Sequence, residues 1–249
     1  MGGFSLIELI IAMTITLVVL TIATTLIARS LNVRTRANDN VDALADAERA
    51  LNIMSREIAQ AGFNMAPPPG GFANGIVPED SITDANGNST IRIRANLNRY
   101  DTSVPDWTNA RNVIGVQNWD AGEDVKYFIY PTADTTLLAR YDRFATNPDT
   151  GALGFSTVLA NKLDKMGIHY FAQRVTYSTP PATNTNLALC DITAPSAAEV
   201  VPAAAKYVVI AVCVRQQAVS VPGSPGYQPA HLLLLTSDVA LRNANLVNY

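Results

Sequence analysis

A long apolar run near the N-terminus is the feature that most constrains how this chain can fold. Residues 4–28 are 25 amino acids, and the only charged side chain among them is Glu8. As an α-helix this run would be about 37 Å long, which exceeds the roughly 30 Å hydrocarbon core of a bilayer. A carboxylate placed in lipid costs roughly 2.5 kcal/mol or more, so Glu8 is a candidate functional residue. We therefore predict one membrane-spanning helix that carries a functional charge near its start.

The residues around Glu8 resemble a known processing motif. Residues 3–8 read Gly-Phe-Ser-Leu-Ile-Glu, which is similar to the N-terminal motif of type IV prepilins and their secretion-system relatives. The resemblance implies that a prepilin peptidase cleaves after Gly3 and methylates the new N-terminus at Phe4. It also implies that Glu8 pairs with the N-terminal amine of a neighbouring subunit during assembly, which reduces the cost of burying the carboxylate. The alternative interpretation is an ordinary signal anchor in which Glu8 has no role.

Two features depart from the usual prepilin pattern. The predicted leader, residues 1–3, carries no Lys or Arg, whereas Arg29 and two further arginines follow the apolar run and oppose the orientation expected from the positive-inside rule. A start codon further upstream would explain the missing basic residue. No Pro or Gly interrupts residues 4–61. Because many major pilins have a helix-breaking proline in the apolar half, its absence favours a straighter helix and a minor subunit.

Helical periodicity continues beyond the apolar run. Residues 29–62 are predicted to form an amphipathic helix that continues into the head, and Gly62 is a suitable C-terminal stop. One apolar stripe with 3-4-3-4-3 spacing consists of Leu44, Ala47, Leu51, Met54, Ile58 and Ala61. The alternative is two helices with a break near residues 38–40, because Asn and Asp favour helix caps over helix interiors.

Two further segments resemble PilW-type minor pilins. Residues 47–63 look like the helix end of that family, with the ending Glu-Ile-x-x-Ala-Gly-Phe, and residues 235–243 look like its C-terminal end. The middle of the chain carries no such resemblance. The resulting domain organisation is a leader at 1–3, a transmembrane or fibre-core helix at 4–28, an amphipathic helix at 29–62 and a globular antiparallel β head at 63–249.

The head is long enough for one α+β domain. Alternation of apolar and polar residues predicts strands at 91–94, 125–130, 137–143, 168–177, 207–215 and 232–235. Turn residues occur at 86–87 and 147–151, and residues 157–166 are predicted as one short helix. We expect an antiparallel sheet wrapped on the C-terminal half of the long helix, which is the type IV pilin fold that the resemblance implies. The loops 67–78 and 179–202 are predicted to be mobile or functional surface.

The chain contains two cysteines, Cys190 and Cys213. In an exported head a Cys190–Cys213 disulfide is favoured over two free thiols. Closing that loop would contribute about 3 kcal/mol in the chain-entropy model. The alternative is that Cys213 simply fills a small core site.

Signatures of enzymes are missing from the sequence. There is no Gly-x-Ser-x-Gly elbow, phosphate-binding glycine loop or Cys-x-x-Cys pair. The two histidines, His169 and His231, are predicted to be structural strand residues rather than metal ligands. Residues 84–88 resemble the start of a calcium loop, but Ser89 and Ala95 stand where a glycine and a glutamate are required, so a hairpin turn is favoured.

The acidic residues give no sign of a catalytic or nucleic-acid site. The adjacent pairs 79–80 and 123–124 are predicted to lie on solvated faces, because neighbouring side chains diverge on a strand. The formal net charge of −3 provides no basic surface for nucleic acid. We therefore predict a protein that is not an enzyme, has no cofactor or metal and does not bind nucleic acid directly.

The resemblance implies a minor type IV pilin that helps to prime or cap pilus assembly and serves twitching motility, adhesion and DNA uptake. Its expected partners are other major and minor pilins, the prepilin peptidase, the inner-membrane assembly platform and, before assembly, the membrane. The expected location is the bacterial inner membrane, with the head in the periplasm, and then the extracellular fibre. The alternatives are a J-type minor pseudopilin of type II secretion, an adhesin at the fibre tip and a major fibre subunit.

Overall fold

A computed structural model describes most of the chain, namely residues 5–63, 74–95, 97, 121–132, 136–181, 183–224 and 226–244. It divides into two compact units. The first consists of Met1–Asp42 and Gln217–Ala230, and the second consists of Ala43–Gln216 and His231–Tyr249.

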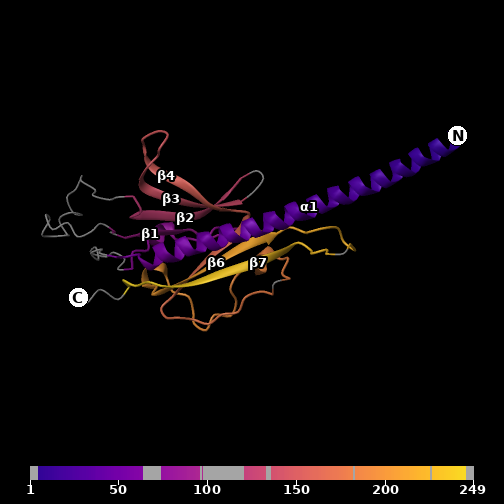
Figure 1. Ribbon diagram of the computed structural model, residues 1–249. Helices are drawn as coiled ribbons and strands as arrows, with labels where there is room; N and C mark the ends of the chain where they lie inside the picture. Colours follow the sequence, from indigo (N-terminus) through magenta and orange to yellow (C-terminus); the bar gives the residue numbers. More distant parts are fainter. Residues whose placement is uncertain are drawn as a thin grey trace. The chain divides into compact units, whose positions relative to one another are not determined.

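One helix, α1 (Leu6–Ala59), continues without a break for 54 residues and is drawn from indigo to purple in Figure 1. It contains neither Pro nor Gly, the residues that most strongly disfavour helix interiors. The alternative of two helices broken near residues 38–40 is wrong, because these residues are helical. The chain leaves the helix before Gly62, whose φ of 76° is the left-handed conformation that commonly follows a helix end.

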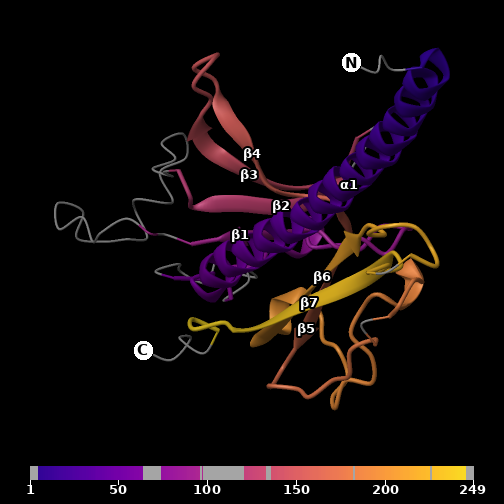
Figure 2. The ribbon, with the colours of Figure 1, turned by 45° about the vertical axis from the view of Figure 1, so that its right-hand side comes forward.

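The described residues of the second unit contain two antiparallel sheets, which Figures 1 and 2 show together with α1. The first sheet has the order β1-β2-β3-β4, with β1 (Ile91–Arg94), β2 (Asp124–Pro131), β3 (Thr136–Thr146) and β4 (Leu153–Asn161). The second has the order β5-β6-β7, with β5 (Leu163–Phe171), β6 (Tyr207–Gln216) and β7 (His231–Ala240). The α+β class is confirmed, with two sheets where the sequence predicts one.

The predicted helix over residues 157–166 is wrong. These residues form the end of β4 and the start of β5, and the single residue between the strands, Lys162, has a φ of 61°. β4 pairs with β3 in a register that includes Arg140↔Thr157, and such cross-strand pairing outweighs local helical periodicity. The other predicted strands are present, although the strand predicted at 168–177 begins earlier and ends at Phe171.

The core of the second unit forms where α1 contacts both sheets. The buried side chains that α1 contributes are Ala43, Ala47, Ala50, Leu51, Met54 and Ile58. They pack with Tyr127 and Leu138 of the first sheet and with Met166 and Ile210 of the second. The predicted stripe is confirmed apart from Leu44, which is half-buried. The alanines on this stripe have small side chains, so α1 packs close to the strands and both sheets share one core with the helix.

Both predicted turns are confirmed. Asp84 Oδ1 accepts the backbone N–H groups of Asn86 (2.9 Å) and Asn88 (2.8 Å), and Gly87 adopts a φ of 78°. This is a turn closed by an aspartate side chain, as its residue types predict. The turn at 147–151 joins β3 to β4.

In the first unit, α1 exposes large apolar side chains from Leu6 to Leu31. By length and composition this part of the helix could cross a membrane. Hydroxyl groups inside this part of the helix donate to its backbone. Thr14 Oγ1 donates to Ile11 O at 2.8 Å, and Thr16 Oγ1 donates to Ala12 O at 2.7 Å. These bonds satisfy the hydroxyls without water, which suits an apolar surrounding.

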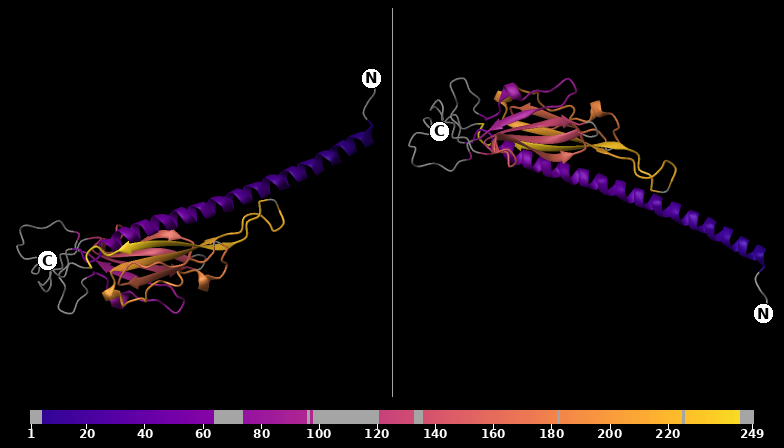
Figure 3. Two further views of the ribbon diagram at one scale, coloured as in Figure 1. Left: turned by 90° about the horizontal axis from the view of Figure 1, so that it is seen from below. Right: turned by 90° about the horizontal axis from the view of Figure 1, so that it is seen from above.

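The rest of the first unit is the connection between β6 and β7, residues 217–230, which we call the arm. Asn40 of α1 bonds both backbone groups of Gln217, since its Nδ2 donates to the carbonyl and its Oδ1 accepts the N–H, each at 3.0 Å. Arg36 Nη1 donates to Ala218 O at 3.2 Å. Figure 3 shows the arm, in yellow, beside α1. The helix residues that follow the apolar run therefore hold the arm by its backbone.

Candidate functional site

Glu8, the predicted assembly residue, lies in the first turn of α1. Its backbone N–H donates to Ser5 O at 3.0 Å, and a carboxylate in this turn interacts favourably with the helix dipole. The neighbouring Leu9 is 57% exposed, so Glu8 is a single charge within an apolar helix surface. Such a surface can bind one cationic group of another apolar helix. Gly3 and Phe4, the predicted cleavage and methylation positions, lie outside the described residues.

The acidic pair 123–124 is buried, and its predicted position on a solvated face is wrong. Glu123 and Asp124 are each only 2% exposed. Asp124 accepts two hydrogen bonds from Arg92, from Nε at 2.6 Å and Nη2 at 2.7 Å, and one from Arg94 Nε at 3.1 Å. The sequence does not reveal this pairing, because β1 and β2 lie about 30 residues apart along the chain and meet only through the sheet.

Asp80 lies at the edge of the same cluster. Its carboxylate contacts Arg92 Nη1 at 2.5 Å and Lys126 Nζ at 3.2 Å. The hydrogen bond from Arg92 lowers the pKa of Asp80 below its usual range, and Lys126 acts in the same direction. Because these carboxylates and cations already pair with one another, the cluster fastens β1 to β2 rather than presenting a reactive group.

A second cluster fastens α1 to the first sheet. The Tyr127 hydroxyl donates to Glu57 Oε2, and Arg140 Nε donates to both oxygens of Glu57, at 3.1 and 3.2 Å. Burial raises the pKa of Tyr127 far above its usual range, and the negative charge of Glu57 adds to the effect. Tyr127 therefore stays neutral and acts as a hydrogen-bond donor.

His169 lies between two carboxylates. Its Nε2 is 2.7 Å from Asp191 Oδ1 and its Nδ1 is 2.8 Å from Glu199 Oε1, while Lys165 Nζ contacts Asp191 Oδ2 at 2.9 Å. Burial alone would lower the pKa of His169, but the hydrogen bonds to Asp191 and Glu199 raise it above its usual value. Burial alone would raise the pKa of Asp191, but His169 and Lys165 lower it to about 2. The cluster joins β5 to the long loop that follows it.

A disulfide holds the same loop to the second sheet. Cys190 and Cys213 are bonded, with their Cα atoms 6.0 Å apart, and both residues are buried. Cys213 lies within β6 and packs with Leu232 of β7. Among the described residues no group of three or more His, Cys, Asp or Glu side chains is arranged to hold a metal ion.

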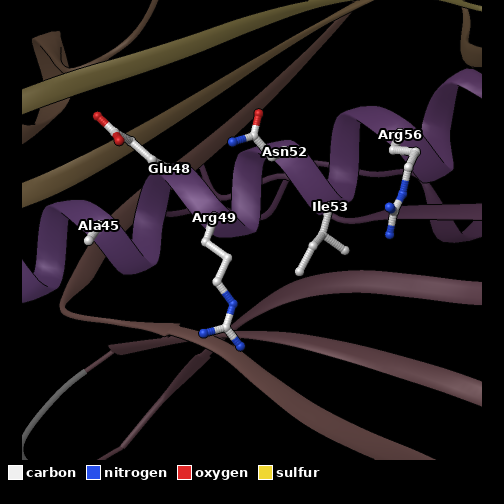
Figure 4. A pocket seen from close by; sticks show the side chains of 6 residues that line it. All are labelled: Ala45, Glu48, Arg49, Asn52, Ile53 and Arg56. Carbon is white, nitrogen blue, oxygen red and sulfur yellow. The ribbon is translucent and has the colours of Figure 1, made fainter.

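An open groove of about 390 Å³ follows the exposed side of α1 in the second unit. Figure 4 shows Arg49, Ile53 and Arg56 pointing to one side and Glu48 and Asn52 pointing to the other. The groove is shallow and mixed in charge, and its lining contains no nucleophile beside a base.

No family model matches the sequence, and neither a curated protein nor a solved structure matches it significantly.

Proposed function

We propose that the chain is a minor type IV pilin of the PilW type, which is processed at its N-terminus, held in the membrane and then packed into a fibre. The observation that carries the proposal is the motif at residues 3–8, which ends in Glu8 and is followed by an uncharged run to Ala28. The unbroken α1 and the antiparallel sheets support it, because the pilin fold implied by the resemblance combines these elements.

In the proposed processing step, water hydrolyses the peptide bond between Gly3 and Phe4. Gly3 leaves with the new carboxylate and Phe4 acquires the free amine, to which the processing enzyme transfers a methyl group from its methyl donor. The amine of one subunit then pairs with Glu8 of its neighbour. An unpaired carboxylate in the hydrocarbon region costs up to roughly 2.5 to 3.5 kcal/mol, the value for the centre of the bilayer. The register of the apolar helices that pairs Glu8 with the amine is therefore favoured over other registers.

The substitution Glu8→Gln tests this role, because it removes the charge while keeping the size of the side chain. We expect normal cleavage and membrane insertion but a drop of about tenfold or more in the amount of this chain in sheared fibres, since about 1.4 kcal/mol corresponds to a tenfold change. Glu48→Gln is the matched control, because Glu48 lies on the same helix but is exposed in the groove. Wild-type incorporation of the Glu8→Gln chain would contradict the proposal.

Deletion of the chain separates the proposal from its alternatives. Loss of fibres supports a role in priming assembly. Loss of protein export with fibres intact supports a J-type pseudopilin instead. Intact fibres that no longer attach to surfaces support an adhesin.

A further inference from the structure

The first unit contains a small cationic pocket where the arm covers α1. Its volume is about 170 Å³. The lining residues are Arg29, Asn32, Val33 and Arg36 of α1 with Ser220, Val221 and Ser224 of the arm.

The donors in this pocket suit a phosphate group. Arg29 and Arg36 are seven residues apart and so lie on the same helix face, about 10 Å apart along the axis. Guanidinium groups stay charged and match the oxygens of phosphate with several N–H donors. The hydroxyls of Ser220 and Ser224 are bonded within the arm, since their Oγ atoms are 2.6 Å apart and Ser224 Oγ donates to Val221 O at 2.6 Å. The two guanidinium groups are therefore the donors that the pocket offers to a phosphate. No carboxylate belongs to the lining, so the pocket is net positive.

The arm is held in the conformation that forms the pocket. Arg36 and Asn40 bond its backbone at Gln217 and Ala218, as described above. Ser220 has a φ of 70°, a left-handed conformation that is uncommon for residues other than glycine. Unusual backbone conformations of this kind cluster at ligand-binding sites, where surrounding contacts maintain them.

The pocket lies at the end of the apolar run, which favours a membrane lipid as the source of the phosphate. Arg29 is the first charged residue after Glu8 and directly follows the run that is long enough to cross a membrane. Basic side chains at the end of a membrane helix lie at the level of the lipid headgroups. Val221, which lines the pocket, is 66% exposed and is followed by the exposed Pro222, so the arm carries apolar residues beside the cations. Basic and apolar residues together are typical of segments that bind the membrane surface.

We propose that this pocket binds the phosphate of an anionic phospholipid headgroup, and that the arm thereby docks on the membrane surface beside α1. The contact fixes the depth of the helix in the membrane until the subunit is extracted. The inference rests on the membrane location in the proposed function, but it does not require assembly into a fibre.

Lipid retention by the full-length chain tests the pocket. The protein is reconstituted in nanodiscs that contain phosphatidylcholine and phosphatidylglycerol, and the lipids that remain bound on release are counted by native mass spectrometry. The double variant Arg29→Gln/Arg36→Gln should retain about tenfold less phosphatidylglycerol than wild type. Val221→Asp keeps both arginines but adds a carboxylate to the lining of the pocket, and it should show the same loss. Arg49→Gln/Arg56→Gln is the matched control, because it also removes two arginines seven residues apart on α1, and it should retain the lipid.

Equal retention by all variants, or an equal loss in both double variants, would overturn the proposal. A separate experiment measures hydrogen exchange of residues 217–230 in detergent with inorganic phosphate and without lipid. If phosphate alone protects the arm as fully as phosphatidylglycerol nanodiscs do, the site binds free phosphate and the lipid assignment is wrong. Selective lipid retention by a chain that is never cleaved or assembled would support this inference while contradicting the proposed function.

Discussion

Replacing Asp124 with asparagine tests whether a buried charge cluster holds the first sheet together. The side chain of Asp124 is 3% exposed and that of its partner Arg92 is 17% exposed. The two are joined by hydrogen bonds of 2.6 and 2.7 Å. Asparagine keeps the shape of the side chain and one acceptor oxygen, but it removes the negative charge that Arg92 and Arg94 both contact.

Removing one partner of a buried ion pair typically costs about 3 to 5 kcal/mol, because the remaining charge is left uncompensated. Asp80, which is 32% exposed and lies 2.5 Å from Arg92, offsets part of this loss. We therefore expect Asp124→Asn to lower the free energy of unfolding by about 3 kcal/mol. The matched control is Asp164→Asn, because Arg215, its partner at 2.5 Å, is 58% exposed. Exposed pairs contribute about 1 kcal/mol or less.

The assay is urea unfolding of the full-length chain in a mild detergent, followed by far-UV circular dichroism. Urea is uncharged and so does not screen the ion pairs. Hydrogen exchange of the peptides that cover β1 and β2 would show whether the loss begins in the first sheet. Equal effects of Asp124→Asn and Asp164→Asn would refute the reasoning, because they would place Asp124 in solvent, as its sequence context predicts.

Three further predictions concern the second sheet and the core. Asp191 has a folded pKa of about 2 against an ordinary 3.8, so it contributes about 2 kcal/mol that is present above pH about 4 and lost as the pH falls toward 2. His169 has a raised pKa, so its contribution is present below pH about 6.5 and lost as the pH rises. Urea midpoints measured across pH should fall both below pH about 4 and above pH about 6.5. His169→Asn should remove the fall above pH about 6.5, and an unchanged fall there would contradict the prediction. Reducing the Cys190–Cys213 bond should lower the free energy of unfolding by about 3 kcal/mol, and equal urea midpoints with and without reductant would argue against it. Met54→Ala, at a fully buried position, should cost about 2 to 5 kcal/mol in the same unfolding assay, and a cost below 1 kcal/mol would show that the stripe is not in the core.

The long helix and its buried stripe could be predicted from the sequence because both depend on local periodicity. The absence of Pro and Gly predicts the continuity of α1, and the 3-4-3-4-3 spacing predicts that Leu51, Met54 and Ile58 are buried. The turn at Asp84 is equally local, since its own side chain closes it.

The features that the sequence does not predict depend on contacts between distant segments. Thr157 and its neighbours are compatible with a helix, and only pairing with β3 makes them a strand. Asp124 is adjacent to Glu123 and would be solvated on an isolated strand, but β1 brings two arginines to it. The arm has no charge of its own, so its place beside Arg36 follows from side-chain to backbone bonds that no sequence pattern marks.

The most direct test of the proposed function is mass spectrometry of the N-terminal peptide, on sheared surface fibres and on membranes from the same cells. The proposal predicts fibre chains that begin at methylated Phe4, in low abundance relative to the main subunit. Cleaved chains confined to the membranes would favour a pseudopilin. Chains in both fractions that still begin at Met1 or further upstream would contradict the pilin assignment and leave α1 as a plain signal anchor.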